Sequence, residues 1–173
     1  IVARKLNIPY NYIRDTLHDF KGAKTRLQYM GQAGNADIYD DYGHHPREIA
    51  ATLNTINQMF PSRRHVVVFQ PHRYTRTAAM YQEFSEVLTM ADSLLVMPIY
   101  PADERPIEGV SSQLICNCLD SSGYHNYHLC QDFEDAACFL SQDLRDRDVL
   151  LTIGAGNVSK IGEIVKERMS AEH

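Results

Sequence analysis

Runs of consecutive apolar residues constrain the fold of this chain more than any other feature. Two of them read Val-Val-Val-Phe at 66–69 and Leu-Leu-Val-Met at 94–97, and a third, near-continuous run ends at Ile153. A strand that is apolar at every position must be covered on both faces, which is the environment of a parallel sheet between two layers of helices. The sequence therefore predicts an α/β fold.

Strands and helices are expected to alternate along the chain. The strand candidates are Asp37–Tyr42, His65–Gln70, Ser93–Met97, Asn126–Leu129 and Asp148–Ile153. Between and after them, apolar residues recur with a period of 3.6 residues, which predicts helices over about 49–60, 80–91, 133–144 and 158–165. This alternation is typical of a Rossmann-like, doubly wound and mostly parallel sheet with helices on both faces.

Composition excludes some classes of partner. A formal net charge of −5 gives no general reason to expect nucleic acid or an anionic membrane, and no stretch approaches the roughly 20 apolar residues that span a bilayer. We therefore expect a cytoplasmic protein. The four cysteines, Cys116, Cys118, Cys130 and Cys138, lack the spacing of zinc ligands, so we expect buried, reduced thiols.

Two polar segments stand out, each directly after a predicted strand. The first is Asp40-Asp41-Tyr42-Gly43-His44-His45-Pro46, and the second is Gln70-Pro71-His72-Arg73-Tyr74-Thr75-Arg76-Thr77. Strand-to-helix turns of a parallel sheet converge on the carboxyl edge of the strands, where open α/β sheets bind their ligands. We expect both segments to line one cleft.

Arg73 and Arg76 are candidates for holding a small anion. They stand three residues apart at the start of a predicted helix, and the arginine fork binds carboxylate in bidentate fashion. The alternative is a solvated pair of basic residues. That alternative is electrostatically unfavourable, because the positive end of the helix dipole already lies there. We favour a carboxylate or phosphate clamp with His72 beside it.

The first segment leaves more alternatives open. Adjacent histidines rarely share one metal ion, so we expect no metal site, a substrate-pocket role for His44 and a structural hydrogen bond in the turn for His45. Asp41 suits accepting hydrogen bonds from ribose hydroxyls or serving as a satisfied turn carboxylate. Tyr42 could face a nucleobase or substrate, or belong to the half-buried core.

Two further stretches carry weaker signals. Gly154-Ala155-Gly156-Asn157 lacks the third glycine of a dinucleotide fingerprint and follows the last strand, so we interpret it as a close-packed turn. Asp103 and Glu104 lie in a stretch that could cover the cleft, although a solvated loop is the favoured interpretation.

The two polar segments, taken with other short strings, resemble the carboxyl-terminal domain of the Mur ligases. The supporting strings are Phe20-Lys21-Gly22 with Arg26, Ile99-Tyr100-Pro101-Ala102-Asp103-Glu104, Gly109-Val110-Ser111-Ser112 and Gly154-Ala155-Gly156-Asn157. Within the family, the second polar segment is most similar to the members that join L-alanine to UDP-N-acetylmuramate in peptidoglycan synthesis. The resemblance runs along nearly the whole chain.

The resemblance implies a division of the chain and roles for its residues. Residues 1–28 would be the tail of a preceding ATP-binding central domain, including a helix with Ile13, Leu17 and Phe20 on one face, and 29–173 the carboxyl-terminal domain. The substrate-binding residues would be His44, His72, Arg73 and Arg76, with the arginines on the alanine carboxylate. Arg26, Asp41 and Tyr42 would face the nucleotide.

The mechanism implied by the resemblance is ATP-dependent amide-bond formation through an acyl phosphate, with magnesium in the full-length enzyme. No Gly-x-x-x-x-Gly-Lys-Thr loop occurs in these 173 residues, so we expect this part to be inactive and to bind no cofactor by itself. A general base is not assigned. The alternatives are a related ligase that recycles a murein tripeptide and a stand-alone, non-catalytic nucleotide-binding module.

Overall fold

The computed structural model describes residues 6, 8–12, 14 and 26–171. Within them, a six-stranded sheet is formed by β1 (Gln28–Ala33), β2 (Ala36–Asp41), β3 (His65–Phe69), β4 (Ser93–Val96), β5 (Tyr127–Leu129) and β6 (Val149–Ile153). The helices that cover it are α3 (Pro46–Met59), α4 (Tyr74–Leu88), α5 (Gln113–Ser121), α6 (Phe133–Asp143) and α7 (Lys160–Ala171). The expected helix face through Ile13, Leu17 and Phe20 lies outside the described residues.

The strand order is β1-β2-β6-β3-β4-β5, and every pair except β1 with β2 is parallel. The last strand, β6, therefore lies between β2 and β3, so the two polar turns flank its carboxyl end. The α/β prediction is confirmed. One strand was missed: β1 pairs antiparallel with β2 across a tight turn, and it carries neither the apolar run nor the strict alternation that would have indicated it.

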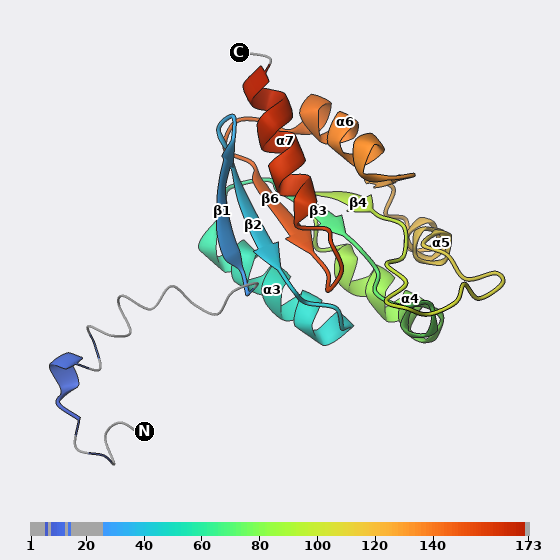
Figure 1. The fold of residues 1–173 in the computed structure, drawn as a ribbon, viewed down its shortest axis with the longest axis horizontal. Coiled ribbons are helices and arrows are strands. Elements are labelled where there is room, and N and C mark those ends of the chain that lie inside the picture. Colours follow the sequence, from blue (N-terminus) through green and yellow to red (C-terminus); the bar gives the residue numbers. More distant parts are fainter. Residues whose placement is uncertain (1–5, 7, 13, 15–25, 172–173) are drawn as a thin grey trace.

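Helices cover both faces of the sheet (Figure 1). Side chains of α3, α4 and α5 pack on one face, where Val67 and Leu151 point, whereas α6 and α7 pack on the other against Val66 and Leu150. Because successive side chains of a strand point to opposite faces, uninterrupted apolar strands supply both cores at once. No helix in the described part of the chain is long and apolar enough to cross a bilayer.

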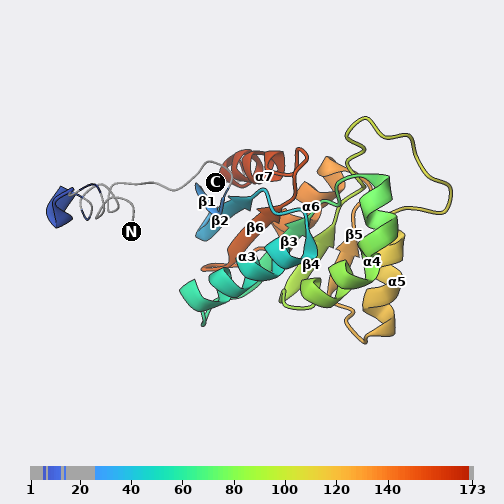
Figure 2. The ribbon, with the colours of Figure 1, turned by 90° about the horizontal axis from the view of Figure 1, so that it is seen from below.

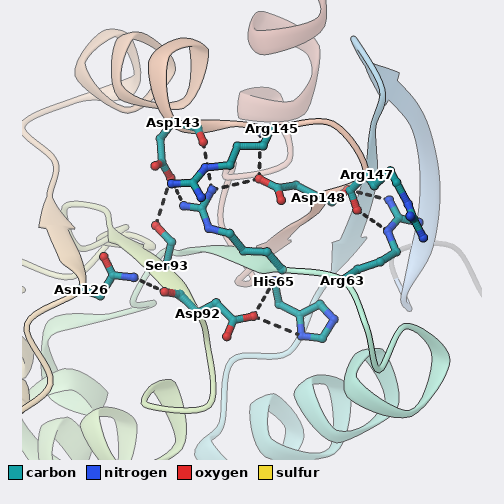
Figure 3. A network of polar contacts seen from close by, with 10 residues as sticks. Arg63, His65, Asp92, Ser93, Asn126, Asp143, Arg145, Arg147 and Asp148 are labelled. Carbon is teal, nitrogen blue, oxygen red and sulfur yellow. Dashed lines mark hydrogen bonds and ion pairs between the residues drawn. The ribbon is translucent and has the colours of Figure 1, made fainter.

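Charged residues bind one another at the amino edge of the sheet, opposite the polar turns (Figure 3). Arg64 donates through Nη1 to the carboxylate of Asp148 at 3.0 Å, and it also pairs with Asp143. Asp92 accepts the backbone N–H of His65 at 2.8 Å. These bonds tie the start of β3 to the residues just before β4 and β6 and to the end of α6. Each of these charged side chains has a partner within the network, so the network stabilises this edge of the fold.

The cysteines only partly match expectation. All four are free thiols, and Cys116 and Cys130 are buried, but Cys118 is half-buried and Cys138 is exposed. The expectation of burial was therefore wrong for Cys138. Its position on α6 lies off the stripe formed by Ala136, Ala137 and Leu140, which faces the sheet.

Candidate functional site

The two polar turns meet at the carboxyl edge of β2, β6 and β3, as the parallel topology requires. The backbone N–H of Gly154 donates to the carbonyl of Asp41 at 3.0 Å, and that of Gln70 donates to Ile153 at 3.1 Å, so the three strand ends are joined. The imidazole rings of His44 and His72 then lie with their centroids 6.0 Å apart. The expectation that these two histidines come together is confirmed.

Four rings form a continuous row across this edge. Tyr42 contacts His44 edge-to-face at a centroid distance of 5.5 Å, and His44 neighbours His72. His72 in turn stacks on Tyr100, with centroids 5.6 Å apart and ring planes 15° apart. Tyr100 was not among the predicted site residues, because it lies beyond β4 and reaches the site through the pairing of residues 72 and 100.

Arg73 and Arg76 stand at the start of α4 but differ in their surroundings. Arg73 precedes the helix with φ at 75°, its side chain is exposed, and its backbone N–H donates to the carbonyl of Tyr100 at 2.8 Å. Arg76 lies back against His72: its Nη1 is 3.3 Å from His72 Nδ1 and 3.3 Å from the carbonyl oxygen of the same residue. One guanidinium is thus anchored, and the other is open to solvent.

The electrostatics of the site favour an anionic ligand. The pKa of His72 lies below its usual value of 6.5, chiefly because burial disfavours the imidazolium and secondarily because Arg76 and His44 are close. At neutral pH the imidazole is therefore uncharged, and its Nδ1 can accept a hydrogen bond from Arg76. The two arginines then supply the positive charge, in a geometry suited to a carboxylate.

Glu48 organises the other turn and was missed by sequence reasoning. Its Oε2 accepts the backbone N–H groups of His44 at 3.1 Å and of His45 at 3.3 Å, and it lies 3.6 Å from His44 Nδ1. Its other oxygen lies 3.8 Å from Nη1 of Arg26. His45 caps α3 together with Glu48 in a capping box, which confirms the structural role expected for His45. The signal was the Pro46 start with a glutamate three residues after His45.

The predicted nucleotide-facing residues are not equally available. Both carboxylate oxygens of Asp41 are engaged, Oδ1 by the N–H of Gly43 and Oδ2 by that of Leu27, each at 2.8 Å, and the residue is buried. This geometry favours the turn-carboxylate alternative. Tyr42 and Arg26 are exposed. The nucleotide roles of all three residues stay predictions.

The glycine-rich turn after β6 is a packing element, as expected. A Cβ atom on Gly154, whose φ is 151°, would lie 2.7 Å from the carbonyl oxygen of Gln70. The Gln70 side chain also exchanges two hydrogen bonds with Asn157, at 3.0 and 3.1 Å. The turn therefore packs closely against the residue that follows β3, and this packing fixes the position of the β6 end relative to the β3 end.

A possible metal-ligand set lies elsewhere. Among the described residues, His128, Cys130 and Asp135 bring their ligand atoms within 4.8 Å of one another. His128 Nε2 is already 3.0 Å from Asp135 Oδ1, and burial raises the pKa of Cys130 to about 12, so the thiol is protonated. These residues belong to β5, α6 and the turn between them, and none of them is a predicted site residue. The expectation of no metal at the polar turns stays untested.

Residues 25–156 match the family model of the Mur ligase glutamate ligase domain. The chain belongs to the Mur ligase family. Its relative in Desulforapulum autotrophicum, a UDP-N-acetylmuramate–L-alanine ligase, is 41% identical over 96% of this chain. The enzyme of the same name in Syntrophobacter fumaroxidans is 43% identical over 94% of the chain. The chain spans only 36% and 34% of the lengths of these Mur ligases.

The architecture agrees with this assignment. The crystal structure of the UDP-N-acetylmuramate–alanine ligase MurC from Thermotoga maritima superposes with a TM-score of 0.82, at 24% identity, over 99% of this chain and 36% of that one. At this identity the likeness bears on the fold alone. It supports the Rossmann-like Mur ligase architecture, whereas roles of individual residues rest on the geometry of the site.

Proposed function

We propose that this Mur ligase chain is the carboxyl-terminal domain of an ATP-dependent ligase that joins L-alanine to UDP-N-acetylmuramate in bacterial peptidoglycan synthesis. The observation that carries the proposal is the cluster at the start of α4, where Arg73 and Arg76 stand beside a neutral His72 and opposite His44. The name shared by relatives about 40% identical agrees with it. Cell-wall synthesis, cell shape and division would depend on the product, made in the cytoplasm.

The proposed role of the cluster is to hold the amino acid. Arg73, whose side chain is exposed, would bind the carboxylate of alanine, with Arg76 contributing from its anchored position on His72. The UDP-N-acetylmuramate carboxylate would take the γ-phosphoryl group of ATP, and the alanine amine would attack the resulting acyl phosphate, releasing phosphate. By holding the carboxylate of alanine, the clamp would keep the amine against the carbonyl carbon and so lower the entropic part of the activation barrier for amide-bond formation.

The phosphate chemistry would come from outside these residues. No phosphate-loop motif occurs in the 173 residues, so the proposal assigns ATP phosphates and magnesium to a central domain of the same polypeptide. Arg26, Tyr42 and Asp41 would face the nucleotide from this side. Closure of the two domains would assemble the reaction centre, and this domain alone would be inactive.

The test is an amino-acid-dependent assay on the full-length enzyme. Phosphate release from ATP with UDP-N-acetylmuramate should require L-alanine, and the tripeptide L-Ala-γ-D-Glu-diaminopimelate should not replace it. Preference for the tripeptide would identify the recycling ligase instead. Nucleotide binding without any amino-acid-dependent turnover would favour a non-catalytic module.

A further inference from the structure

The loop between β4 and α5 is fastened to the start of α4. In Figure 2 this loop, residues 97–112, projects from the body of the domain beside α4. The N–H of Tyr100 donates to Pro71 and its carbonyl accepts from Arg73, both at 2.8 Å. Four residues on, Glu104 accepts the backbone N–H of Thr75 at 3.0 Å and its hydroxyl at 2.6 Å. Most of this stretch is exposed, as the favoured interpretation of a solvated loop predicts, but the carboxylate of Glu104 is hydrogen-bonded to Thr75.

Glu104 takes the place of a missing helix cap. The first N–H groups of a helix have no partner within it, and a side chain just before the helix usually accepts one of them. In α4 the residue at that position is Arg73, which makes no capping hydrogen bond, and the first turn contains no acidic residue. A carboxylate from a different segment supplies the acceptor. The Thr75 hydrogen bonds hold the pKa of Glu104 below its usual value, with a smaller contribution from Arg73.

The fastening coincides with unusual backbone geometry on both sides. Arg73 has φ at 75°, and Ala102 and Asp103 have φ at 48° and 66°. Residues other than glycine rarely adopt positive φ, and such conformations persist where surrounding contacts enforce them. Arg73 is held at its own N–H by Tyr100, and its second neighbour Thr75 is held by Glu104. Its backbone is thus constrained from the loop at two points.

We propose that Glu104 is a positioning residue for the amino-acid substrate. By binding Thr75 it holds the loop on α4 and keeps Arg73 in the conformation that directs its exposed guanidinium toward the carboxylate site, while Tyr100 stays stacked on His72. This inference rests on the proposed function of the Arg73 and Arg76 clamp. Glu104 itself contacts no reacting atom.

The expected signature is a separation of kinetic constants. Loss of the Glu104 contacts should loosen Arg73 and so weaken binding of the amino acid before and during the reaction, whereas the residues proposed to face the nucleotide lie at or beside β1 and β2. In the full-length enzyme, Glu104→Ala should raise the KM for L-alanine about tenfold, the size typical of a lost charge-assisted hydrogen bond. The kcat and the KM for ATP should stay within about twofold of the wild type, because uniform binding alone is affected.

Two further variants separate position from charge. Glu108→Ala removes an exposed carboxylate from the same loop and should leave the KM for L-alanine unchanged. Thr75→Val removes the hydroxyl group that donates to Glu104. Because both substitutions remove this same hydrogen bond, the rise in the KM for L-alanine of the double variant Glu104→Ala with Thr75→Val should be smaller than the product of the two single rises. An equal rise in KM for Glu108→Ala would overturn the proposal by showing a general charge effect.

Amide hydrogen exchange provides a readout that does not depend on the substrate. In the full-length protein, Glu104→Ala should speed exchange at Thr75 and Arg73 and leave β3 protected. If Glu104→Ala exchanged at the wild-type rate and bound L-alanine normally in an active enzyme, the positioning role would be refuted. If the wild type showed no L-alanine-dependent turnover, the proposed function would fail, while faster exchange in the variant would still establish the fastening.

Discussion

At the scale of single residues, the decisive pair is His72 with Arg76. A guanidinium carries only hydrogen-bond donors. For the 3.3 Å contact between Arg76 Nη1 and His72 Nδ1 to be a hydrogen bond, Nδ1 must therefore be the acceptor. The uncharged imidazole that this contact needs is also what burial favours. Protonation of His72 would place a third positive charge beside two arginines and remove the Nδ1 acceptor, leaving Arg76 with only the carbonyl oxygen of His72 as its partner in this pair.

This pair leads to a pH prediction. Because the pKa of His72 is lowered on folding, the unfolded chain binds a proton that the native site resists, and stability falls as pH drops below about 6.5, the ordinary pKa of a histidine in an unfolded chain. NMR titration should show the His72 ring titrating below 6.5. Glutamine does not titrate, so the free energy of unfolding of His72→Gln should fall less between neutral and acidic pH than that of the wild type. A His72 that titrates above 6.5 would contradict the electrostatic account of the site.

Arg73 provides the test of the clamp. In the full-length enzyme, Arg73→Ala should weaken the use of L-alanine by about 1.5–3 kcal/mol, the usual cost of losing a hydrogen bond to a charged group. The apparent ATP affinity should change little. Arg105→Ala, which removes an exposed arginine from the neighbouring loop, is the matched control. A raised KM for ATP with a normal KM for L-alanine would assign Arg73 to the nucleotide.

At the scale of elements, the site depends on how three turns fit together. The β6 turn packs on Gln70 at the end of β3 and on Tyr100 beyond β4. The β2 turn is closed by Glu48 from the first turn of α3. No helix carries the site alone; each turn places one or two side chains, and the contacts between turns set their separation.

The β6 turn can be tested by adding one methyl group. A Cβ atom on Gly156 would lie 2.7 Å from Cγ of Tyr100 and would also meet the side chain of Gln70. Gly156→Ala should therefore destabilise the fold by about 1–3 kcal/mol, as overpacking usually does. Gly123→Ala, at a glycine with φ of 82° and no atom within 4 Å of its Cβ position, measures backbone strain without a clash. If close packing of the β6 turn stabilises the fold, Gly156→Ala should lower the Tm more than Gly123→Ala does.

At the scale of the whole molecule, the six strands of the described sheet and the helices on both of its faces lie within residues 28–171. Leu27 is also bound, through its N–H, to Asp41, so a domain cut near residue 26 preserves contacts that a cut at 29 would remove. The domain boundary at residue 29 stays a prediction.

Autonomy of this domain is the corresponding prediction. Residues 26–173 should unfold in one cooperative thermal transition, with a stability in the common range of about 5–15 kcal/mol. The same fragment should release no phosphate from ATP in the presence of UDP-N-acetylmuramate and L-alanine, because no phosphate-loop motif occurs in the sequence. Alanine-dependent turnover by the purified fragment would refute this division of labour. A broad, non-cooperative transition would show that residues 26–173 do not fold by themselves.

Sequence alone determined the architecture and the edge of the sheet at which the candidate site lies. Runs such as Val66–Phe69 require two covered faces, and turns after parallel strands must share an edge, so the meeting of His44 with His72 followed from local pattern and topology. The role of His45 as a cap could be read in the same way, since capping is a local interaction.

Only the tertiary structure decided which polar groups are free to bind a ligand. It engaged both oxygens of Asp41, laid Arg76 on His72 and left the side chain of Arg73 exposed. It also brought Tyr100 and Glu104, about thirty residues away in sequence, against the start of α4. These contacts depend on how separate turns pack together. The periodicity or spacing of residues within one segment does not encode the distance between two segments.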